Sequence, residues 1–475
     1  MKTKANASRL NRRDFLRLTC AGAVAMSVAP HALGREAAEQ KTPKPNLIVI
    51  LADDLGYGDL GCYGSERNPS PHLDALAAGG IRFTDFHANG AVCSPTRAAL
   101  MTGRYQQRCG IVEVLFAASD RDKGLPRSEI TFAKRLKDAG YATGVFGKWH
   151  LGYDPKFNPT HFGFDRFRGY VSGNIDYISH LDGTGVPDWW DNATPITEEG
   201  YTTHLVHKHA VQFIEENKDR PFCLYVANEA VHSPYQGPND PRQRFPGGGG
   251  KLVNPPKDRG RTYTEMIKAM DDGVGQIMAT LKRLGLERDT FVFFFSDNGA
   301  VPVGSNAPLR GFKSSLWEGG HREPAIAYWP GKIPAGKVCD ELTIGMDLYP
   351  TVLAVAGAAV ADERNLDGVS LFSLLTERKS LGERTLFWAY GEQRAVRQGP
   401  WKLDVSVRNQ TSSPALFHLA KDIGEKNDLA AAEPGRVKAM LAALAAWEKN
   451  VGVNASAGAP AKRKKAKAGE KKRGE

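Results

Sequence analysis

Near its start the chain reads Asn46-Leu47-Ile48-Val49-Ile50-Leu51-Ala52, and Asp53-Asp54 follows at once. The apolar run is too short for an ordinary helix and too continuous for a strand with one solvent-exposed face. It therefore predicts a central strand of a parallel sheet, buried on both faces. Where the backbone turns at the strand end, both carboxylates can converge, and two adjacent buried charges are costly unless a cation neutralises them.

Three more apolar runs also end in polar clusters. Residues 141–146 lead to Gly147-Lys148-Trp149-His150, residues 221–226 to His232-Ser233-Pro234, and residues 290–295 to Ser296-Asp297-Asn298-Gly299. Helix-like segments at 128–139, 202–216 and 263–284 lie between them, and a further strand at 325–329 precedes a helix at 345–356. This alternation predicts an α/β fold with a doubly wound, mostly parallel sheet, whose ligand crevice lies at the carboxyl ends of the strands.

The chain is expected to contain one large domain, a small one and a tail. The large domain spans residues 45–380, and residues 381–452 form a smaller α+β subdomain. In that subdomain, short strand-like pieces near 386–390, 395–396, 401–405 and 415–419 precede an amphipathic helix at 436–447. This order predicts a small antiparallel sheet with one helix. The tail, 453–475, is rich in Ala, Lys and Gly and is expected to be disordered.

The N-terminus has the pattern of an export signal. Asn11-Arg12-Arg13-Asp14-Phe15-Leu16-Arg17 is a twin-arginine motif, and a short apolar region and the small-residue site Ala32-Leu33-Gly34 follow it. We predict a signal peptide over residues 1–34 and export of the folded protein by the Tat machinery of a bacterium. The expected location is the periplasm or the medium. Cys20 follows Thr19 too early for a lipoprotein anchor, and no stable membrane anchor is expected.

Charge and cysteine content exclude several classes of protein. The net charge is +10, but residues 1–40 carry seven Lys and Arg against three Asp and Glu, and residues 461–475 carry eight against two. The rest is nearly neutral, so no nucleic-acid partner is expected. Six scattered cysteines without C-x-x-C spacing argue against a zinc ribbon or a dense disulfide framework, and a Cys62–Cys109 bridge stays open.

The strand-end clusters contain two kinds of side chain, oxygen ligands for a cation and basic groups for an anion. Asp53, Asp54, Asp297 and Asn298 supply only oxygen ligands, which suit a hard cation such as calcium or magnesium better than zinc. Each motif alone is more often a turn, but both follow strongly apolar strands. The candidates for anion binding and proton transfer are Lys148, His150, His232 and Lys313. His204, His207 and His209 share one predicted helix, and we interpret them as surface residues.

A further stretch reads Ala91-Val92-Cys93-Ser94-Pro95-Thr96-Arg97-Ala98-Ala99-Leu100-Met101-Thr102-Gly103-Arg104. Ser94 can cap a helix and Pro95 suits its first position, so Cys93 is expected at or just before a helix N-terminus, which favours an anion. Arg97 lies one turn further in. The ordinary alternative is a buried cysteine beside a helix cap.

These motifs together resemble the formylglycine-dependent sulfatases of the alkaline phosphatase superfamily, in the style of arylsulfatase A and N-acetylgalactosamine-6-sulfatase. The resemblance extends from about residue 46 to 428 and rests on the cysteine signature and five further motifs. These are Leu51-Ala52-Asp53-Asp54-Leu55-Gly56-Tyr57-Gly58-Asp59, Gly147-Lys148-Trp149-His150, His232-Ser233-Pro234, Ser296-Asp297-Asn298-Gly299, and Arg310-Gly311-Phe312-Lys313 with Trp317-Glu318-Gly319-Gly320-His321-Arg322-Glu323-Pro324. One departure is His321, where a small aliphatic residue is more usual.

The resemblance implies an alkaline-phosphatase-like fold and hydrolysis of sulfate esters of carbohydrates. A separate maturation enzyme would oxidise Cys93 to formylglycine, whose hydrate is the nucleophile. One Ca²⁺ would be held by Asp53, Asp54, Cys93, Asp297 and Asn298. Asp297 would assist deprotonation of the nucleophile, and Arg97 would hold it and stabilise the metal site.

The other roles follow from the same resemblance. Lys148, Lys313 and His232 would bind the sulfate oxygens, with His232 the proton donor to the leaving alcohol. His150 would deprotonate the second hydroxyl, so that the aldehyde re-forms. The side chains of Ser172, Asp176, Tyr177 and His180 are expected to line the sugar pocket.

Two other functions stay open. One is a phosphatase or phosphonate monoester hydrolase of the same fold, which extra His and Asp ligands for two zinc ions would favour. The other is a non-catalytic glycan-binding relative, against which the intact set of reactive residues argues.

Overall fold

The computed structural model describes residues 44–359, 366–408 and 411–453. The predicted signal peptide and all of the predicted tail except Val453 lie outside these ranges, so both stay predictions. Among the described residues, no helix combines the length and the apolar character that a membrane span requires.

Cys62 and Cys109 are both free thiols, so the bridge left open by the sequence does not form.

A ten-stranded sheet runs through the large domain in the order β11-β2-β10-β9-β1-β8-β4-β5-β6-β7. At its centre β1 (Asn46–Ala52) pairs in parallel with β8 (Phe222–Ala227) on one side and β9 (Thr290–Ser296) on the other. All residues of these three strands are buried. The prediction of a doubly wound, mostly parallel sheet is confirmed.

The outer strands complete this sheet on both sides. On one side lie β4 (Ala142–Lys148) and β5 (Arg166–Tyr170), both parallel to the centre, and then the short β6 (Trp190–Asp191) and β7 (Thr194–Pro195). On the other lie β10 (Ala325–Tyr328), which is antiparallel to β9, then β2 (Ile81–Phe83) and β11 (Lys337–Cys339). A separate two-stranded pair joins β3 (Phe86–His87) to β12 (Thr343–Ile344).

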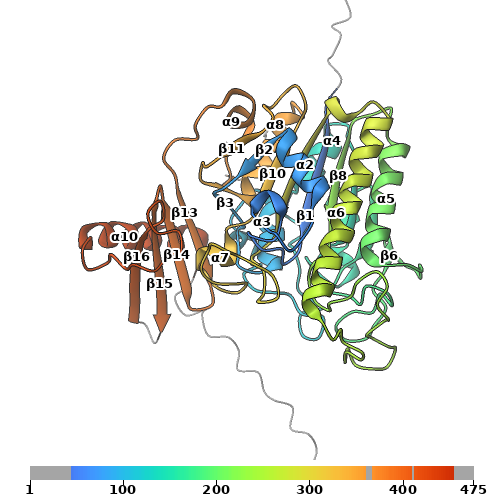
Figure 1. Ribbon diagram of the computed structural model, residues 1–475, viewed down its shortest axis with the longest axis horizontal. Helices are drawn as coiled ribbons and strands as arrows, with labels where there is room; N and C mark the ends of the chain where they lie inside the picture. Colours follow the sequence, from blue (N-terminus) through green and yellow to red (C-terminus); the bar gives the residue numbers. More distant parts are fainter. Residues whose placement is uncertain (1–43, 360–365, 409–410, 454–475) are drawn as a thin grey trace, which may run out of the picture. The chain divides into compact units, whose positions relative to one another are not determined.

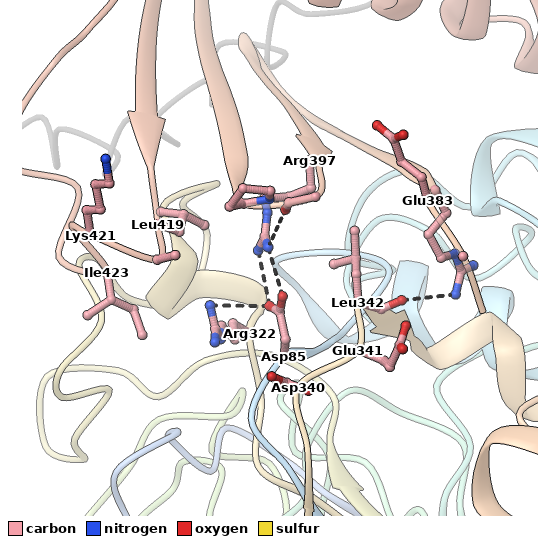
Figure 2. A pocket seen from close by; sticks show the side chains of 15 residues that line it. Asp85, Arg322, Asp340, Glu341, Leu342, Glu383, Arg397, Leu419, Lys421 and Ile423 are labelled. Atoms are coloured by element: carbon pink, nitrogen blue, oxygen red, sulfur yellow. Dashed lines mark hydrogen bonds and ion pairs between the residues drawn. The ribbon is translucent and has the colours of Figure 1, made fainter. Parts of the chain in front are cut away.

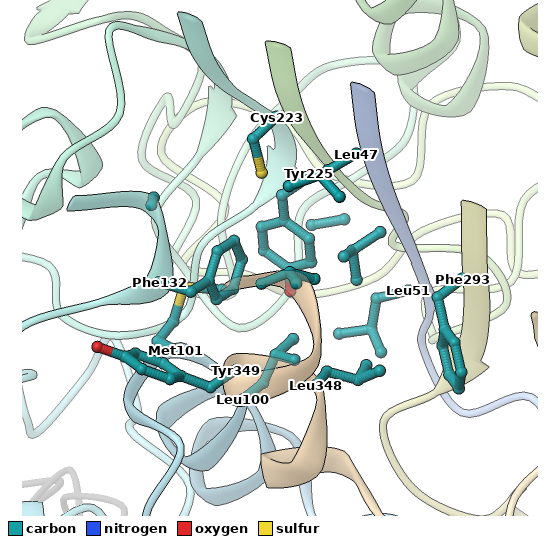
Figure 3. Packing of buried hydrophobic residues seen from close by; sticks show 14 of the residues in the cluster. Leu47, Leu51, Leu100, Met101, Phe132, Cys223, Tyr225, Phe293, Leu348 and Tyr349 are labelled. Carbon is teal, nitrogen blue, oxygen red and sulfur yellow. The ribbon is translucent and has the colours of Figure 1, made fainter. Parts of the chain in front are cut away.

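Helices cover both faces of the sheet (Figure 1). One face carries α2 (Pro71–Gly79), α5 (Thr202–Glu216) and α6 (Arg259–Arg283), which bury Ile48 and Ile50 of β1. The other carries α3 (Cys93–Thr102), α4 (Phe132–Asp138) and α8 (Leu348–Val355). Their Leu100, Phe132 and Leu348 pack with Leu47 and Leu51 (Figure 3). Alternate residues of β1 thus serve opposite cores, which explains its continuous apolar sequence.

A four-stranded antiparallel sheet forms the C-terminal part. Its strands follow in chain order as β13 (Thr385–Tyr390), β14 (Gln393–Gln398), β15 (Trp401–Arg408) and β16 (Thr411–His418), and α10 (Pro434–Val451) follows them. Trp388 and Leu403 share a core with Ala99 of α3 and Ile344 of β12. The small sheet therefore packs on the element that carries Cys93, while the domain boundaries at residues 380 and 452 stay predictions.

The remaining elements are short. They are α7 (Glu318–His321), α9 (Phe372–Glu377) and the 3₁₀ turns at Gly61–Tyr63, Gln106–Cys109, Pro155–Phe157, Pro159–Phe162, Glu287–Asp289 and Gly345–Asp347.

Helix starts differ from prediction where side chains cap them. The helix predicted from residue 128 begins at Phe132, because the Thr131 side chain accepts a hydrogen bond from the Lys134 amide. The one predicted from 263 begins at Arg259, since Asp258 caps it. The prediction that Ser94 caps α3 is wrong. The helix already begins at Cys93, and Ser94 Oγ instead accepts a hydrogen bond from the Leu115 amide at 3.2 Å.

The interpretation of three surface histidines is wrong for His207. His204 is exposed and His209 is half-buried, but the His207 side chain is only 1% exposed, between α5 and α6. Its Nδ1 lies 2.8 Å from the Thr203 carbonyl oxygen. Gly273 of α6 provides the space, because a Cβ there would come within 2.2 Å of the imidazole. The helical spacing alone did not reveal that a second helix covers this face.

We expect Gly273→Ala to destabilise the protein, although alanine favours helices. The imidazole of His207 cannot move without disturbing the α5–α6 contact, so overpacking should lower the free energy of unfolding by about 1–3 kcal/mol. The measurement is urea unfolding. Gly435→Ala in α10 is the matched control, because no atom of the described residues lies within 4 Å of the position that its added methyl group would occupy. That variant should be neutral or slightly stabilising. Equal effects of the two substitutions would contradict the prediction.

Candidate active site

The polar clusters predicted from the sequence meet at one edge of the sheet. Asp53 and Asp54 follow β1, Asp297 follows β9, Lys148 ends β4 and His232 follows β8. Backbone hydrogen bonds continue past the strand ends, from the Asp297 amide to the Ala52 carbonyl and from the Asp53 amide to the Ala230 carbonyl, both at 3.0 Å. The strand ends therefore hold these side chains in fixed positions relative to one another.

Arg97 joins the carboxylates of two adjacent strands. Its Nη2 lies 3.0 Å from Asp53 Oδ2 and 2.9 Å from Asp297 Oδ2, and its side chain is 1% exposed. Its Nη1 donates to the Lys148 carbonyl at 3.0 Å and to the Tyr225 hydroxyl at 3.3 Å. Burial disfavours its charge, but Tyr225, Asp297 and Asp53 outweigh this and raise the pKa of Arg97. The guanidinium therefore stays charged in the core.

The two carboxyl groups bound by Arg97 differ in their preference for charge. Burial favours the neutral form of Asp53, but Lys148, whose Nζ lies 2.5 Å away, and other nearby cations lower its pKa well below the usual range. Burial, followed by the Asp53 charge, raises the pKa of Asp297 to about 7. Among these carboxyl groups, Asp297 is therefore the one that takes up a proton more readily than Asp53.

Asp54 is held by a different set of partners. Its backbone is left-handed, with φ of 60°, a conformation that Asp adopts more readily than most residues. Its Oδ1 lies 2.5 Å from Lys313 Nζ and accepts a hydrogen bond from Asn298 Nδ2 at 2.7 Å. Its Oδ2 lies 3.7 Å from His232 Nε2. Lys313, far away in the sequence, is thereby brought to the same carboxylate cluster.

The donor set fits a hard cation. Asp53 Oδ1 and Asn298 Oδ1 are buried and accept no hydrogen bond from the described residues. Burial and the charge of Asp53 raise the pKa of Asp297, so its charged form lacks sufficient stabilisation. A buried acceptor without a partner is costly, and a cation that takes oxygen ligands removes that cost. Asp53, Asp54, Asp297 and Asn298 are thus the residues that could hold such an ion.

Cys93 stands at the first position of α3 and is 2% exposed. Burial, despite the nearby charges of Lys148 and Lys313, raises the pKa of its thiol. Because the thiolate is the reactive form of cysteine, the unmodified side chain is a poor nucleophile near neutral pH. The electrostatics therefore do not favour a cysteine hydrolase.

Both predicted proton-transfer histidines lie in the site and are neutral. His150 Nε2 lies 2.8 Å from the Leu115 carbonyl, and its Nδ1 is buried without a partner among the described residues. Burial, followed by Lys148, lowers the pKa of His150 well below its usual value. His232 Nδ1 donates to the Ser233 carbonyl at 2.6 Å, and burial lowers its pKa to about 4. Each ring thus has one nitrogen free to exchange a proton.

The four residues expected to line a sugar pocket are buried, and their polar atoms bond within the protein. Asp176 Oδ2 accepts from the amides of Gln243 and Arg244, and the Tyr177 hydroxyl donates to the His232 carbonyl. Ser172 Oγ donates to the Asn174 carbonyl, and His180 stacks on Trp189. The geometry favours a role in shaping this loop, and contact of these residues with a sugar stays a prediction.

Two side chains at this edge were not found from the sequence. Tyr225 on β8 holds Arg97, and a polar hydroxyl within an apolar strand was the available signal. Glu229 lies just past the same strand and is 1% exposed. Its Oε1 accepts a hydrogen bond from the Ile175 amide at 2.9 Å, and burial raises its pKa well above the usual value. A carboxylate three residues before His232 could have been noticed.

Comparison with known proteins settles the family. The sulfatase family model matches residues 45–358. The chain belongs to the sulfatases. It is 33% identical to mouse N-acetylgalactosamine-6-sulfatase, over 86% of this chain and 86% of that protein, and 36% identical to bovine arylsulfatase A, over 81% and 83%. The predicted family and the predicted class, a sulfuric ester hydrolase, are confirmed.

Solved structures support the same fold. The crystal structure of Ps i-CgsB matches this sulfatase with a TM-score of 0.76 and 31% identity, over 85% of this chain and 92% of that one. The phosphonate monoester hydrolase of Agrobacterium radiobacter has a TM-score of 0.64 at 19% identity and shares the fold alone. The expectation of an alkaline-phosphatase-like architecture is confirmed.

We expect Arg97→Leu to destabilise the sulfatase strongly. The substitution leaves Asp53 and Asp297 buried without their shared cation, so the free energy of unfolding should fall by about 3–5 kcal/mol. The measurement is denaturant unfolding followed by circular dichroism. Arg261→Leu is the control, because that side chain is 78% exposed and its one ion pair among the described residues is with Glu265. The control should change stability by no more than about 0.5 kcal/mol, and a similar small effect of Arg97→Leu would contradict the assigned role.

Proposed function

We propose that this sulfatase hydrolyses sulfate esters of carbohydrates, with a formylglycine made from Cys93 and one Ca²⁺ ion. The observation that carries the proposal is the convergence of Cys93, Arg97, two lysines and an oxygen-only donor set at one sheet edge. The relatives support the carbohydrate part, since one is named for a sulfated amino sugar and Ps i-CgsB was solved in complex with k-i-k-neocarrahexaose.

The proposed ion site consists of Asp53, Asp54, Asp297 and Asn298, completed by residue 93 after its modification. The calcium ion would supply positive charge for the sulfate oxygens, and the hydrated formylglycine would supply a hydroxyl nucleophile. Arg97 keeps Asp53 and Asp297 together, so the carboxylates are positioned before any ion binds. Asp297, with its raised pKa, is the group suited to take a proton from the nucleophile.

Lys148 and Lys313 are proposed to bind the sulfate oxygens. Their ammonium groups approach the carboxylate cluster from two sides, one at Asp53 and one at Asp54. Positive charge fixed in a buried site stabilises a group that gains negative charge in the transition state. Glutamine at either position would keep the length of the chain but lose that charge.

His232 and His150 are proposed to transfer protons. His232 Nε2 is free of strong partners and faces Asp54, so this ring can donate a proton to the leaving alcohol once it is protonated. His150 Nδ1 is unpartnered and buried, so it can accept the proton of the second hydroxyl when the aldehyde re-forms. The two rings follow different strands, β4 and β8, and are proposed to serve successive halves of the reaction.

A phosphatase-like reaction is less well supported. Among the described residues, the His and carboxylate group at this edge is Asp53, Asp54 and His232, and the two other such groups involve different elements. A pair of zinc ions would need a second set of ligands beside the first. The intact reactive side chains also argue against a purely glycan-binding role.

Export and maturation complete the proposal. The twin-arginine sequence supports passage through the Tat machinery to the periplasm or the medium, and the Cys-Ser-Pro-Thr-Arg sequence supports recognition by a formylglycine-generating enzyme. Cys93 is buried in the folded protein, so its modification would have to precede folding of α3.

Peptide mass spectrometry of protein from a host that carries the maturation enzyme tests the modification. We expect the peptide with Cys93 to carry an aldehyde or its hydrate, while Cys109 stays a thiol. Cys93→Ala should lower kcat/KM on a sulfated sugar by about 10³-fold or more, because the nucleophile is lost. A thiol at position 93 in a fully active enzyme, or faster turnover of the matching phosphate ester, would contradict the proposal.

Removal of calcium tests the ion site. Dialysis against a chelator should abolish sulfate ester hydrolysis, and Ca²⁺ should restore it. Asn298→Ala should raise the Ca²⁺ concentration for half-maximal activity about 10-fold or more, because one ligand oxygen is lost. Asp272→Ala, a surface carboxylate paired with Lys268, should leave that concentration unchanged. Full activity in the chelated protein would rule out the ion.

A further inference from the structure

A second group of metal-ligand side chains lies outside the proposed active site. His87 on β3 and Glu318 and His321 on α7 each place a ligand atom within 4.8 Å of the other two. All three side chains are fully buried, at 0% exposure. The proposed function uses none of these three residues.

The Nε2 atoms of the two imidazoles already have hydrogen-bond partners. His87 Nε2 lies 2.9 Å from Asp85 Oδ1, and His321 Nε2 lies 3.1 Å from the Leu316 carbonyl oxygen. Both of these partners are acceptors, which favours a proton on each Nε2, although Arg397 Nη1 also lies 3.3 Å from His87 Nε2. Carboxylate and carbonyl partners of this kind are typical of metal-binding histidines, because they fix the tautomer and the ring orientation.

The Nδ1 atoms of the two rings face each other. His87 Nδ1 and His321 Nδ1 are 3.0 Å apart. Two neutral rings protonated at Nε2 direct two lone pairs at each other, which is unfavourable unless a cation lies between them. Neutral imidazole is also the form that binds metals.

Charged side chains of both signs surround the two histidines. The cationic side chains here are Arg322, Arg397 and Lys402, and the carboxyl groups are Asp85, Glu318, Asp404 and Glu425. There is one more carboxyl group than there are cationic side chains. Glu318 Oε1 accepts no hydrogen bond from the described residues but lies 3.3 Å from Lys402 Nζ, and Glu318 Oε2 pairs with Arg322 and Arg397.

We propose that His87 Nδ1, His321 Nδ1 and the Glu318 carboxylate bind one divalent transition-metal ion of the zinc type. Imidazole nitrogen with a carboxylate suits such ions, whereas the oxygen-only set at the catalytic edge suits calcium. Tetrahedral coordination at about 2.0–2.1 Å sets two nitrogens about 3.3 Å apart, so the imidazoles need to separate only slightly. The ion would take the place of any proton that the two Nδ1 atoms share.

The position of the site indicates a structural role. The imidazole of His321 stacks on Trp388 of the C-terminal sheet, with ring centroids 4.5 Å apart, and Glu318 pairs with Arg397 of the same sheet. A cavity of about 680 Å³ opens beside it, and Figure 2 shows Asp85, Arg322 and Arg397 in its wall. An ion could reach the Asp85 side of the site through this cavity. It would fasten β3 to α7 where the two sheets meet.

The test uses the full exported protein, saturated with Ca²⁺ so that the catalytic edge is filled, and then given Zn²⁺ or Co²⁺. We expect one transition-metal ion per chain after gel filtration, by elemental mass spectrometry. Cobalt should give the visible absorption of nitrogen coordination, and zinc at 100 times its Kd should raise the Tm by about 3 °C or more. His321→Val and His87→Gln should each bind zinc at least 10-fold more weakly.

Two controls separate this site from others. His207→Gln alters another buried histidine and should keep the metal, and Asn298→Ala at the proposed calcium site should also keep it. Wild-type protein that takes up no transition metal would overturn the proposal and leave a proton between the rings, and so would full binding by His321→Val. If both histidine variants fail to fold, the cobalt spectrum of the wild type decides, since oxygen ligands alone give a different absorption. None of these readouts depends on sulfatase activity.

Discussion

The rest of the site depends on the guanidinium of Arg97, which lies between the carboxylates of Asp53 and Asp297. Those carboxylates end two neighbouring parallel strands, and without a shared cation their charges would repel each other in a buried setting. Because Arg97 lies one helical turn after Cys93, the interaction that neutralises the carboxylates also fixes the start of α3 against the sheet. Position 93 is therefore placed by electrostatics as well as by packing.

The sheet makes this arrangement possible because its strands are buried on both faces. The side chains of β1 alternate between two apolar cores, so the strand is rigid up to its last residue. Asp53, Asp54, Lys148 and Asp297 lie at or just after strand ends, and parallel strands end at the same edge. The C-terminal sheet then packs on α3 through Trp388 and its neighbours, which supports the helix from the other side.

Burial determines the chemistry that the side chains at this edge can perform. It raises the pKa of the Cys93 thiol and keeps His150 and His232 neutral, so neither a thiolate nor a pair of imidazolium ions is available near neutral pH. An enzyme built on these residues needs a nucleophile of another kind. A cation could add positive charge to the site, because Asp53 Oδ1 and Asn298 Oδ1 are buried and accept no hydrogen bond from the described residues.

The sequence by itself determined the sheet, the strand ends and the motif residues, because a strand buried on two faces must be continuously apolar and must end where its polar residues begin. Asn46–Ala52 and Thr202–Glu216 were predicted to the residue. Only the tertiary structure decided what covers a side chain. The packing of α6 on α5 buries His207. Asp176 accepts hydrogen bonds from the amides of Gln243 and Arg244, and the Tyr177 hydroxyl donates to the His232 carbonyl. His87 and His321, 234 residues apart in the sequence, are in direct contact. Local periodicity reports the face on which a residue lies, whereas contacts between distant segments depend on how whole elements pack.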